Sequence, residues 1–486
     1  MERADLEALH KDEIIQLFME QQEQLKQLRA DIEALKMKFE KNQKPRTSSK
    51  NSSQPPSRDQ KGNLPTSRRR HRHGPPVGHE KHVRKFVSNP DKIVELRVKS
   101  CCKCHADLSR EAGKLFELNQ ITELPAAPAQ VIEVRQYATT CPECGTSQIE
   151  EPPAGLDMEH RFGSRLEATV VYYRQEQHMS YARTQKALKD LHQVEISQGG
   201  IDVIMKRAGK WAVGKVDEIQ EGVRQSQVIH CDETTNRIDG ANTWEWVFCT
   251  VKGILHVIRR NRSVEVIREV MSGKQAEVWV SDCYGGQLKA PAQQRQLCMA
   301  HQLRNLQHVL DAQPHLTWIL CLRKLFRRAI QVHRQRHQMT PQQFEKQVVN
   351  IERTCDRLLH QEVEPPEAQR LKRRYIKYRA CLFVFLHRSD VEPTNNIAER
   401  SLRHSVVHRK VTNGFRSNWG THTYAALASV IDTAELAGVR AFDAIQSLLG
   451  PPALPITLAC ESLHTTKGES GFLHPLKRSG FRREDG

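Results

Sequence analysis

The chain has 486 residues, and at roughly 150 residues per domain this length predicts about three domains. Its 74 Lys and Arg residues outnumber 57 Asp and Glu residues, and the formal net charge of +17 favours a polyanionic partner, with nucleic acid ahead of an anionic membrane. No stretch approaches the roughly 18 to 20 apolar residues that cross a bilayer, and the N-terminus lacks an apolar signal segment, so we expect a cytoplasmic protein. The thirteen scattered cysteines argue against a disulfide framework and for free thiols or a metal site.

A heptad pattern predicts a leucine-zipper-like helix in residues 1–40. Large apolar side chains recur at alternating steps of four and three, with Gln21 as an interruption. They are Ile14, Phe18, Leu25, Leu28, Ile32, Leu35 and Phe39. We expect this seam to join copies of the chain in a short coiled coil. The alternative is a helix that packs the same stripe against its own body.

Residues 41–85 are predicted to form a disordered basic linker. The segment is rich in Pro, Ser and basic residues and nearly free of large apolar ones, so it cannot bury enough surface to offset chain entropy. Its basic cluster could bind phosphates non-specifically through counterion release. The cluster consists of Arg68, Arg69, Arg70 and Arg72. The alternative is a solvated spacer.

Residues 86–160 are predicted to form a small zinc-binding module. Cys101 and Cys104 lie in one CxxC pair, and Cys141 and Cys144 lie in another. Four thiolates from two tight turns suit a tetrahedral zinc ion, and a filled coordination shell indicates a structural role. Cys102 could replace Cys101 as the ligand. The alternative is a set of buried cysteines or a redox pair.

Residues 161–226 are predicted to be helical. The run from Ser180 to Trp211 is typical of helix, turn and helix, with Ser197 as the N-cap of the second helix. Such a pair could be a helix-turn-helix that places its second helix in the major groove of DNA. A generic helical hairpin has the same pattern.

Short β runs begin near residue 227, and residues 227–445 are predicted to form a mixed α/β domain. The expected strands lie at 227–232, 243–251, 254–260 and 276–282, with a helix at 263–272 and a further strand within 295–301. A basic, helical insertion at about 302–390 interrupts this domain. Residues 446–486 are predicted to be a loose C-terminal tail.

Two aspartates are expected at the ends of neighbouring strands, Asp232 in the first run and Asp282 in a later one. Two carboxylates that lie close together repel each other unless a cation screens them. Paired carboxylate oxygens on rigid strands are also the ligands that Mg²⁺ requires. Glu399, on the helix after the insertion, is the best candidate for a third ligand. Glu233 should face away from Asp232 and be structural. Asp239 is expected in a hairpin turn.

Two further pairs of residues have weaker signals. Cys298 and His301 have a metal-ligand spacing, but two ligands alone favour a satisfied core pair over a metal site. Trp244 and Trp246 alternate along a strand, which favours sheet core over a base-stacking platform.

The ordered set of motifs resembles the transposases of the insertion-sequence-66 family. The strings that carry the resemblance are VIHCDETTNRIDGANTWEWVFCT, VWVSDCYGG, RQLCMAHQLRNL and EPTNNIAERSLRHSVVHRKVTNGFRS. The similarity extends from the N-terminal helix through the CxxC pairs to about residue 436. Departures from the family pattern occur at Cys283, at Gly285 to Gln287, at Met299 and after Glu399.

The resemblance implies a multidomain α+β protein with a ribonuclease-H-like catalytic core of the DDE type, in which Asp232, Asp282 and Glu399 are the triad. It implies a bacterial, nucleoid-associated enzyme that uses Mg²⁺ or Mn²⁺ to cut and join DNA at the inverted repeats of an insertion sequence and in target DNA, as a homo-oligomer and with accessory proteins of the same element. Basic side chains near Glu399 would grip phosphates, unless they form only a solvated basic face. They are Arg400, Arg403, Arg409 and Lys410. The alternatives are a catalytically degenerate, zinc-containing protein that occupies transposon ends, and a nuclease without strand transfer.

Overall fold

The computed structural model describes residues 11–43, 86–111, 114–122, 124, 128–152 and 160–450. Most of the predicted linker and almost all of the predicted tail therefore lie outside the described residues. No helix in the described part of the chain is long and apolar enough to cross a membrane.

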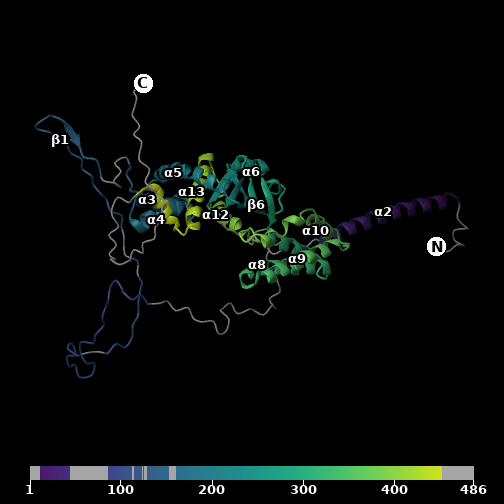
Figure 1. Cartoon of the computed structure of the whole chain (residues 1–486), viewed down its shortest axis with the longest axis horizontal. Coiled ribbons are helices and arrows are strands. Elements are labelled where there is room, and N and C mark those ends of the chain that lie inside the picture. The colour runs from purple at the N-terminus through teal and green to yellow at the C-terminus, as the bar shows by residue number, and fades with distance from the viewer. Residues whose placement is uncertain are drawn as a thin grey trace.

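The predicted N-terminal helix is present as α2 (Lys11–Gln43), drawn in purple in Figure 1. Four apolar side chains of the heptad stripe are exposed to solvent in this single chain, namely Phe18, Leu25, Leu28 and Ile32. An exposed apolar stripe is the surface that a coiled coil would bury. Self-association through α2 stays a prediction.

A five-stranded mixed sheet occupies the centre of the molecule, in the order β5-β4-β3-β6-β7. Its strands are β3 (Val228–Ile238), β4 (Ala241–Cys249), β5 (Ile254–Arg259), β6 (Ala276–Ser281) and β7 (Ala292–Leu297). Strands β3, β4 and β5 pair in antiparallel fashion, whereas β6 and β7 run parallel to β3. The strands that the sequence predicts are thus all present, and α6 (Val264–Met271) is the predicted helix before β6.

The turn between β3 and β4 is the predicted hairpin. Asp239 and Gly240 have φ angles of 46° and 77°, and the residues on either side of them, Ile238 and Ala241, are paired. Two successive positive φ angles are typical of a type I′ turn, which matches the twist of the strands. Asp239 therefore serves the turn and lies apart from the carboxylates described below.

Helices cover both faces of the sheet. On one face, α6 packs Val266, Ile267 and Val270 against a core that includes Trp246 and Trp279. On the other face lie α12 (Asn396–Thr412) and α13 (Asn418–Leu436). Trp246 is fully buried, as expected for sheet core, whereas Trp244 is half-buried beneath the guanidinium of Arg262.

A second group of helices packs against α13. Three of its helices precede the sheet strands in the chain, and one follows them. The group contains α3 (Ser164–Gln175), α4 (Tyr181–His192), α5 (Gln198–Arg224) and α14 (Ala441–Leu449). Helices α5 and α13 cross closely at Gly209, where an added Cβ would lie 2.3 Å from Oγ1 of Thr423. In Figure 1 the labels α3, α4, α5 and α13 lie together, and α12 lies between them and β6.

The predicted insertion is helical throughout and joins the edge of the sheet formed by β6 and β7. Its elements are α7 (Met299–Ala312), α8 (Thr317–Arg334), α9 (Pro341–His360), α10 (Pro366–Lys377) and α11 (Val384–His387). Figure 1 shows α8, α9 and α10 gathered in one green group. Val280 and Leu297 of the sheet share one hydrophobic core with these helices, so the insertion is packed against the sheet.

A buried polar network ties β4 and β5 to the helices on the second face. The ring of His256 lies 3.0 Å from Oε1 of Glu245 and 3.0 Å from Oδ2 of Asp432, and Ser405 donates to Glu245 at 2.5 Å. Burial opposes a charge on His256, but the hydrogen bonds to Asp432 and Glu245 outweigh it and raise its pKa to about 10. The network thus holds a charged histidine between two acids.

Candidate active site

The register of two parallel strands brings Asp232 and Asp282 to the same edge of the sheet. His230 of β3 pairs with Val280 of β6, and each aspartate follows its paired residue by two positions. From the sequence we expected Asp232 to end its strand, but the structure shows that it does not. Strand β3 continues to Ile238 because β4 pairs along its whole length. Asp232 therefore lies within the strand, just past the point where pairing with β6 stops.

Asp232 lies on the sheet face that α12 covers. In the antiparallel register it is opposite Val247, which packs against Ala398 and Leu402 of α12. Burial raises the pKa of the Asp232 carboxyl well above its usual range, and the negative charges of Glu233, Asp282 and Glu399 raise it further. Asp282 and Glu399 thus both act on Asp232, and the adjacent Glu233 contributes more than either of them.

Glu399 reaches this site because Asn395, the N-cap of α12, is fixed to two other elements. The Nδ2 group of Asn395 donates to the backbone oxygen of Cys231 at 2.8 Å, and its Oδ1 lies 3.2 Å from Nδ1 of His230. Its backbone N–H donates to Sγ of Cys298 at 3.2 Å. Asn395 is fully buried. It positions the first turn of α12, which carries Glu399, over the strand that carries Asp232.

Two residues of α7, Arg304 and His301, contact the side chain of Glu399. The guanidinium of Arg304 donates to Oε1 of Glu399 at 3.2 Å, and Nδ1 of His301 lies 3.5 Å from the same oxygen. Burial and the charge of Arg304 lower the pKa of His301, against the opposing effect of Glu399 and Asp282. His301 therefore faces both Glu399 and Asp282 in its neutral form at neutral pH.

Glu233 lies on the opposite sheet face from Asp232, as the sequence predicts. Its side chain forms an ion pair with Arg262 at 2.6 Å and accepts a hydrogen bond from Gln287 at 2.6 Å. Gln287 is fully buried and also accepts from Nε1 of Trp279 at 2.8 Å. This arrangement supports a structural role for Glu233, and Gln287 is a supporting residue that the sequence analysis missed.

The backbone around the two aspartates orients their side chains. Oδ1 of Asp282 accepts from the backbone N–H of Tyr284 at 2.7 Å, and Oδ1 of Asp232 accepts from that of Glu233 at 2.9 Å. Each aspartate keeps a second oxygen beyond these contacts. The donor set is made of hard carboxylate oxygens that repel one another, which fits Mg²⁺ or Mn²⁺.

Only one group of three metal-ligand donors with all atoms within 4.8 Å occurs in the part of the chain that the structure describes. It consists of Cys298, His301 and Glu399. Asp232 and Asp282 are not in this group. The residues of the predicted triad thus do not form a group of this kind, and their role as joint metal ligands stays a prediction. The sequence analysis found only two candidate ligands here, Cys298 and His301, because the third donor, Glu399, is distant along the chain.

The four cysteines of the predicted zinc module form two turns of the same kind. In each, the first cysteine donates its N–H to the residue five positions on, and its carbonyl accepts from the residue four positions on. That fourth residue has a positive φ in both turns, 54° at His105 and 71° at Gly145. The second turn connects β1 (Ala138–Thr140) with β2 (Ser147–Ile149). The structure does not bring the two pairs into one ligand group, and the zinc site stays a prediction.

The predicted DNA-contacting residues are spread over several elements. Arg400, Arg403 and Lys410 lie on the exposed side of α12, whereas Arg409 is half-buried and donates to Oγ1 of Thr235 at 2.7 Å. Ser197 is the N-cap of α5 as predicted, and its Oγ accepts from the backbone N–H of Gly200 at 3.0 Å. The basic cluster of the linker lies outside the described residues; it comprises Arg68, Arg69, Arg70 and Arg72.

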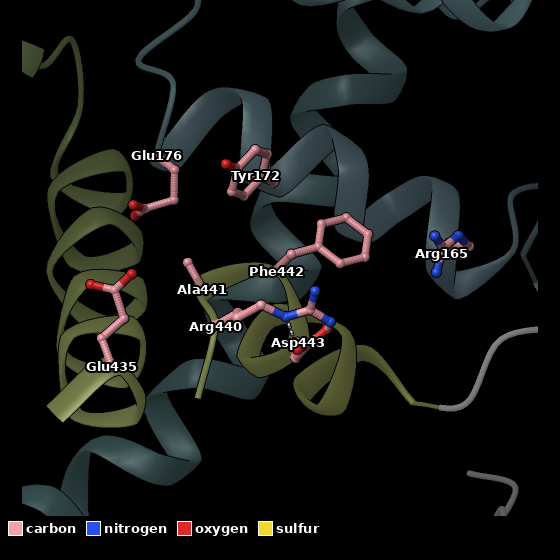
Figure 2. Close-up of a pocket in the computed structure, with 8 residues that line it drawn as sticks. All are labelled: Arg165, Tyr172, Glu176, Glu435, Arg440, Ala441, Phe442 and Asp443. Atoms are coloured by element: carbon pink, nitrogen blue, oxygen red, sulfur yellow. Dashed lines mark hydrogen bonds and ion pairs between the residues drawn. The ribbon is translucent and has the colours of Figure 1, made fainter. Parts of the chain in front are cut away.

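A cavity of about 670 Å³ lies away from the carboxylates, among α3, α13 and α14 (Figure 2). Glu176 and Glu435 approach it from facing elements, and Arg440 is paired with Asp443 at 2.6 Å. Burial raises the pKa of Glu176 to about 6, and Glu435 contributes to the rise. None of the residues that line this cavity belongs to the predicted triad.

The profile described as "Transposase IS66 family" matches residues 159–423, which is more than half of the chain and includes the five-stranded sheet, the insertion and α12. No curated protein matches the chain.

Proposed function

The chain belongs to the IS66 family of transposases, and from this premise we propose that it cleaves and joins DNA strands at the ends of an insertion sequence in a reaction that depends on a divalent metal. The observation that carries the proposal is geometric: the register of β3 and β6 brings Asp232 and Asp282 to one sheet edge, and Asn395, the N-cap of the helix with Glu399, donates to the Cys231 oxygen beside Asp232. We propose that the sheet is a ribonuclease-H-like core, since its mixed order places two carboxylates at one edge and a helix with the third above them.

Asp232 and Asp282 would hold Mg²⁺ or Mn²⁺, and Glu399 would complete the coordination. The ions, when bound, supply Lewis-acid activation of the attacking hydroxyl and stabilise the departing oxygen at phosphorus. The protein's own groups do the positioning. Asn395 fixes the start of α12, Arg304 holds one oxygen of Glu399, and Tyr284 orients Asp282 through its backbone N–H.

DNA would be held by cationic surfaces on the insertion and on α12. A groove of about 580 Å³ on α8 is lined by Arg323, Lys324, Arg327 and Arg328. Partial burial and the neighbouring charge of Arg327 lower the pKa of Arg323, which shows that like charges crowd there. The carboxylate of Asp311 acts on Arg323 in the opposite direction, so it balances only part of the positive charge of the groove. Phosphates of a duplex would supply the missing negative charge.

The remaining parts of the proposal concern assembly and partners. We propose that α2 joins copies of the transposase in a coiled coil, that the two CxxC turns share a structural zinc ion, and that α4 and α5 contribute to DNA recognition. The exposed stripe on α2, the matching cysteine turns and the capped start of α5 support these roles in turn. The accessory proteins and nucleoid association implied by the family resemblance belong to the same proposal.

The decisive experiment measures Mg²⁺-dependent cleavage of DNA that carries the terminal inverted repeats of the element. Asp232→Asn and Asp282→Asn should each abolish cleavage, because an amide is a poor ligand for Mg²⁺. Asp239→Asn is the matched control, since Asp239 lies in the β3–β4 turn and Asn tolerates its positive φ. Cleavage that survives in the first two variants would reject the metal-ligand assignment. DNA binding without cleavage by the unaltered protein would favour the degenerate DNA-binding alternative.

A further inference from the structure

We propose that Cys298, His301 and Glu399 form a second metal site, one that takes a single thiophilic transition-metal ion of the zinc class. The three donor atoms lie within 4.8 Å of one another. The binding itself does not rest on the proposed function. A consequence for catalysis does, because Glu399 belongs to both sites.

Two helix starts hold the donors in place. Cys298 directly precedes α7 and His301 lies in its first turn, so the two side chains share one face at a spacing of three residues. Glu399 lies in the first turn of α12. The backbone N–H of Met299 donates to the oxygen of Pro393 at 2.9 Å, which joins the two helix starts. The ligands are therefore fixed by backbone contacts before any ion binds.

The donor types select the metal. A sulfur, an imidazole nitrogen and a carboxylate oxygen together suit Zn²⁺ or Co²⁺, whereas Mg²⁺ prefers oxygen ligands alone. Three protein ligands leave a fourth tetrahedral position for water or another group.

A buried nitrogen without a hydrogen bond also supports the site. Nδ1 of His301 is buried and lies 3.5 Å from Oε1 of Glu399, but it forms no hydrogen bond among the described residues. Buried polar atoms are rarely left unpaired, and an absent ion is one physical explanation for such an atom.

The surroundings of the Cys298 sulfur disfavour a thiolate when no cation is bound. Burial raises its pKa to about 11, whereas the backbone N–H groups of Asn395, His301 and Ala300 act in the opposite direction. A bound cation would offset the free-energy cost of forming a buried thiolate, because a thiol that coordinates a metal loses its proton. The metal would thus replace the proton on Cys298.

Occupation of this site would withdraw Glu399 from the aspartates. Arg304 now donates to Oε1 of Glu399, and an ion at Cys298 and His301 would have to displace that guanidinium or use the other carboxylate oxygen. In either case Glu399 would be committed to the thiophilic ion. We therefore expect Zn²⁺ to inhibit the Mg²⁺-dependent reaction by taking one of its ligands.

Cobalt binding to the full-length protein tests the site without relying on activity. Co²⁺ bound to a thiolate gives a near-ultraviolet charge-transfer absorption, and the difference between unaltered protein and Cys298→Ser cancels the contribution of the CxxC pairs. We expect the unaltered protein to bind one more equivalent of Co²⁺ than Cys298→Ser, and His301→Gln to weaken that equivalent at least ~10-fold. Cys355→Ser, which alters a fully buried cysteine of α9, is the matched control and should leave the spectrum unchanged.

Equal cobalt stoichiometry in the unaltered protein and Cys298→Ser would overturn the proposal. If Cys298→Ser fails to fold by circular dichroism, His301→Gln provides the same comparison, and unchanged affinity there would overturn it as well. Inhibition is measured separately as the Zn²⁺ concentration that halves cleavage, which should rise at least ~10-fold in Cys298→Ser. Absence of any cleavage would count against the proposed function alone, because the cobalt measurement would still decide the metal site.

Discussion

Asn395 donates a hydrogen bond of 2.8 Å to the backbone oxygen of Cys231, a residue 164 positions earlier in the chain. This contact joins the helix that carries Glu399 to the strand that carries Asp232. The same asparagine contacts His230 and Cys298, so the relative position of the carboxylates depends on one fully buried amide.

Asn395→Ala should impair cleavage and stability together. The substitution leaves the Cys231 oxygen buried without its partner, which costs about 1 to 3 kcal/mol in the free energy of unfolding. Cleavage should fall further than the loss of folded protein explains, because α12 loses its anchor. Urea unfolding and cleavage at a temperature where both proteins are folded check the two effects. Asn242→Ala, at an exposed position of β4, is the control. Normal cleavage by Asn395→Ala would contradict the positioning role.

The buried His256 predicts a loss of stability at alkaline pH. Its pKa of about 10 in the folded protein exceeds the unfolded value of about 6.5. The stabilisation is therefore complete below about pH 6.5 and is lost as the pH rises through about 10. His256→Gln should lower the free energy of unfolding at pH 6.5 by about 3 kcal/mol or more, because Glu245 remains buried without its counter-ion. The difference between the two proteins should shrink as the pH rises toward 10. A difference that stays constant would contradict a charged His256.

The contact between α5 and α13 predicts opposite effects at two glycines of one helix. Gly209→Ala would place a Cβ 2.3 Å from Oγ1 of Thr423 and should destabilise the protein by about 1 to 3 kcal/mol. At Gly214 an added Cβ meets nothing within 4 Å, so Gly214→Ala should stabilise α5 by about 0.5 to 1 kcal/mol. Thermal unfolding of both variants measures the contrast. Equal shifts in the same direction would show that α5 and α13 do not cross at Gly209.

The groove on α8 predicts a change in the salt dependence of DNA binding. If Arg323 and Arg327 each neutralise one phosphate, their joint replacement by Gln should reduce the slope of log affinity against log salt by about 1.8. Arg370→Gln with Arg440→Gln removes the same charge from side chains that already pair with Glu367 and Asp443. Fluorescence anisotropy with a duplex at several salt concentrations measures the slope. A change of the same size in both double variants would mean that net charge, and not this groove, is responsible.

The stripe on α2 predicts that oligomeric mass depends on two leucines. Leu25→Glu with Leu28→Glu puts two charges into the heptad seam and should reduce the mass found by light scattering. Gln22→Glu with Gln27→Glu adds the same charge on the same helix without altering an apolar position of the seam. An unchanged mass in the leucine variant would remove α2 from the assembly.

Local patterns in the sequence predicted the strands, the helices and the turn at Asp239, because each depends on neighbouring residues. Residue types and their order along the chain selected Asp232, Asp282 and Glu399 as a metal-binding set, and the family resemblance implied the same triad; their joint role as ligands stays a prediction. The parts that sequence reasoning missed depend on contacts between distant segments. Gln287 supports Glu233, Asn395 fixes α12, and Glu399 becomes the third donor beside Cys298 and His301, yet no local periodicity marks any of these relationships.

The insertion leaves the sheet and returns to it at almost the same point, since the backbone of Met299 at its start is hydrogen-bonded to that of Pro393 at its end. Everything between these two residues is a closed excursion of the chain. Its length can vary between relatives, or be changed by an engineer, while the acidic residue downstream keeps its place over the sheet. Such a layout would let the surface that we propose for DNA binding diversify independently of the proposed chemistry.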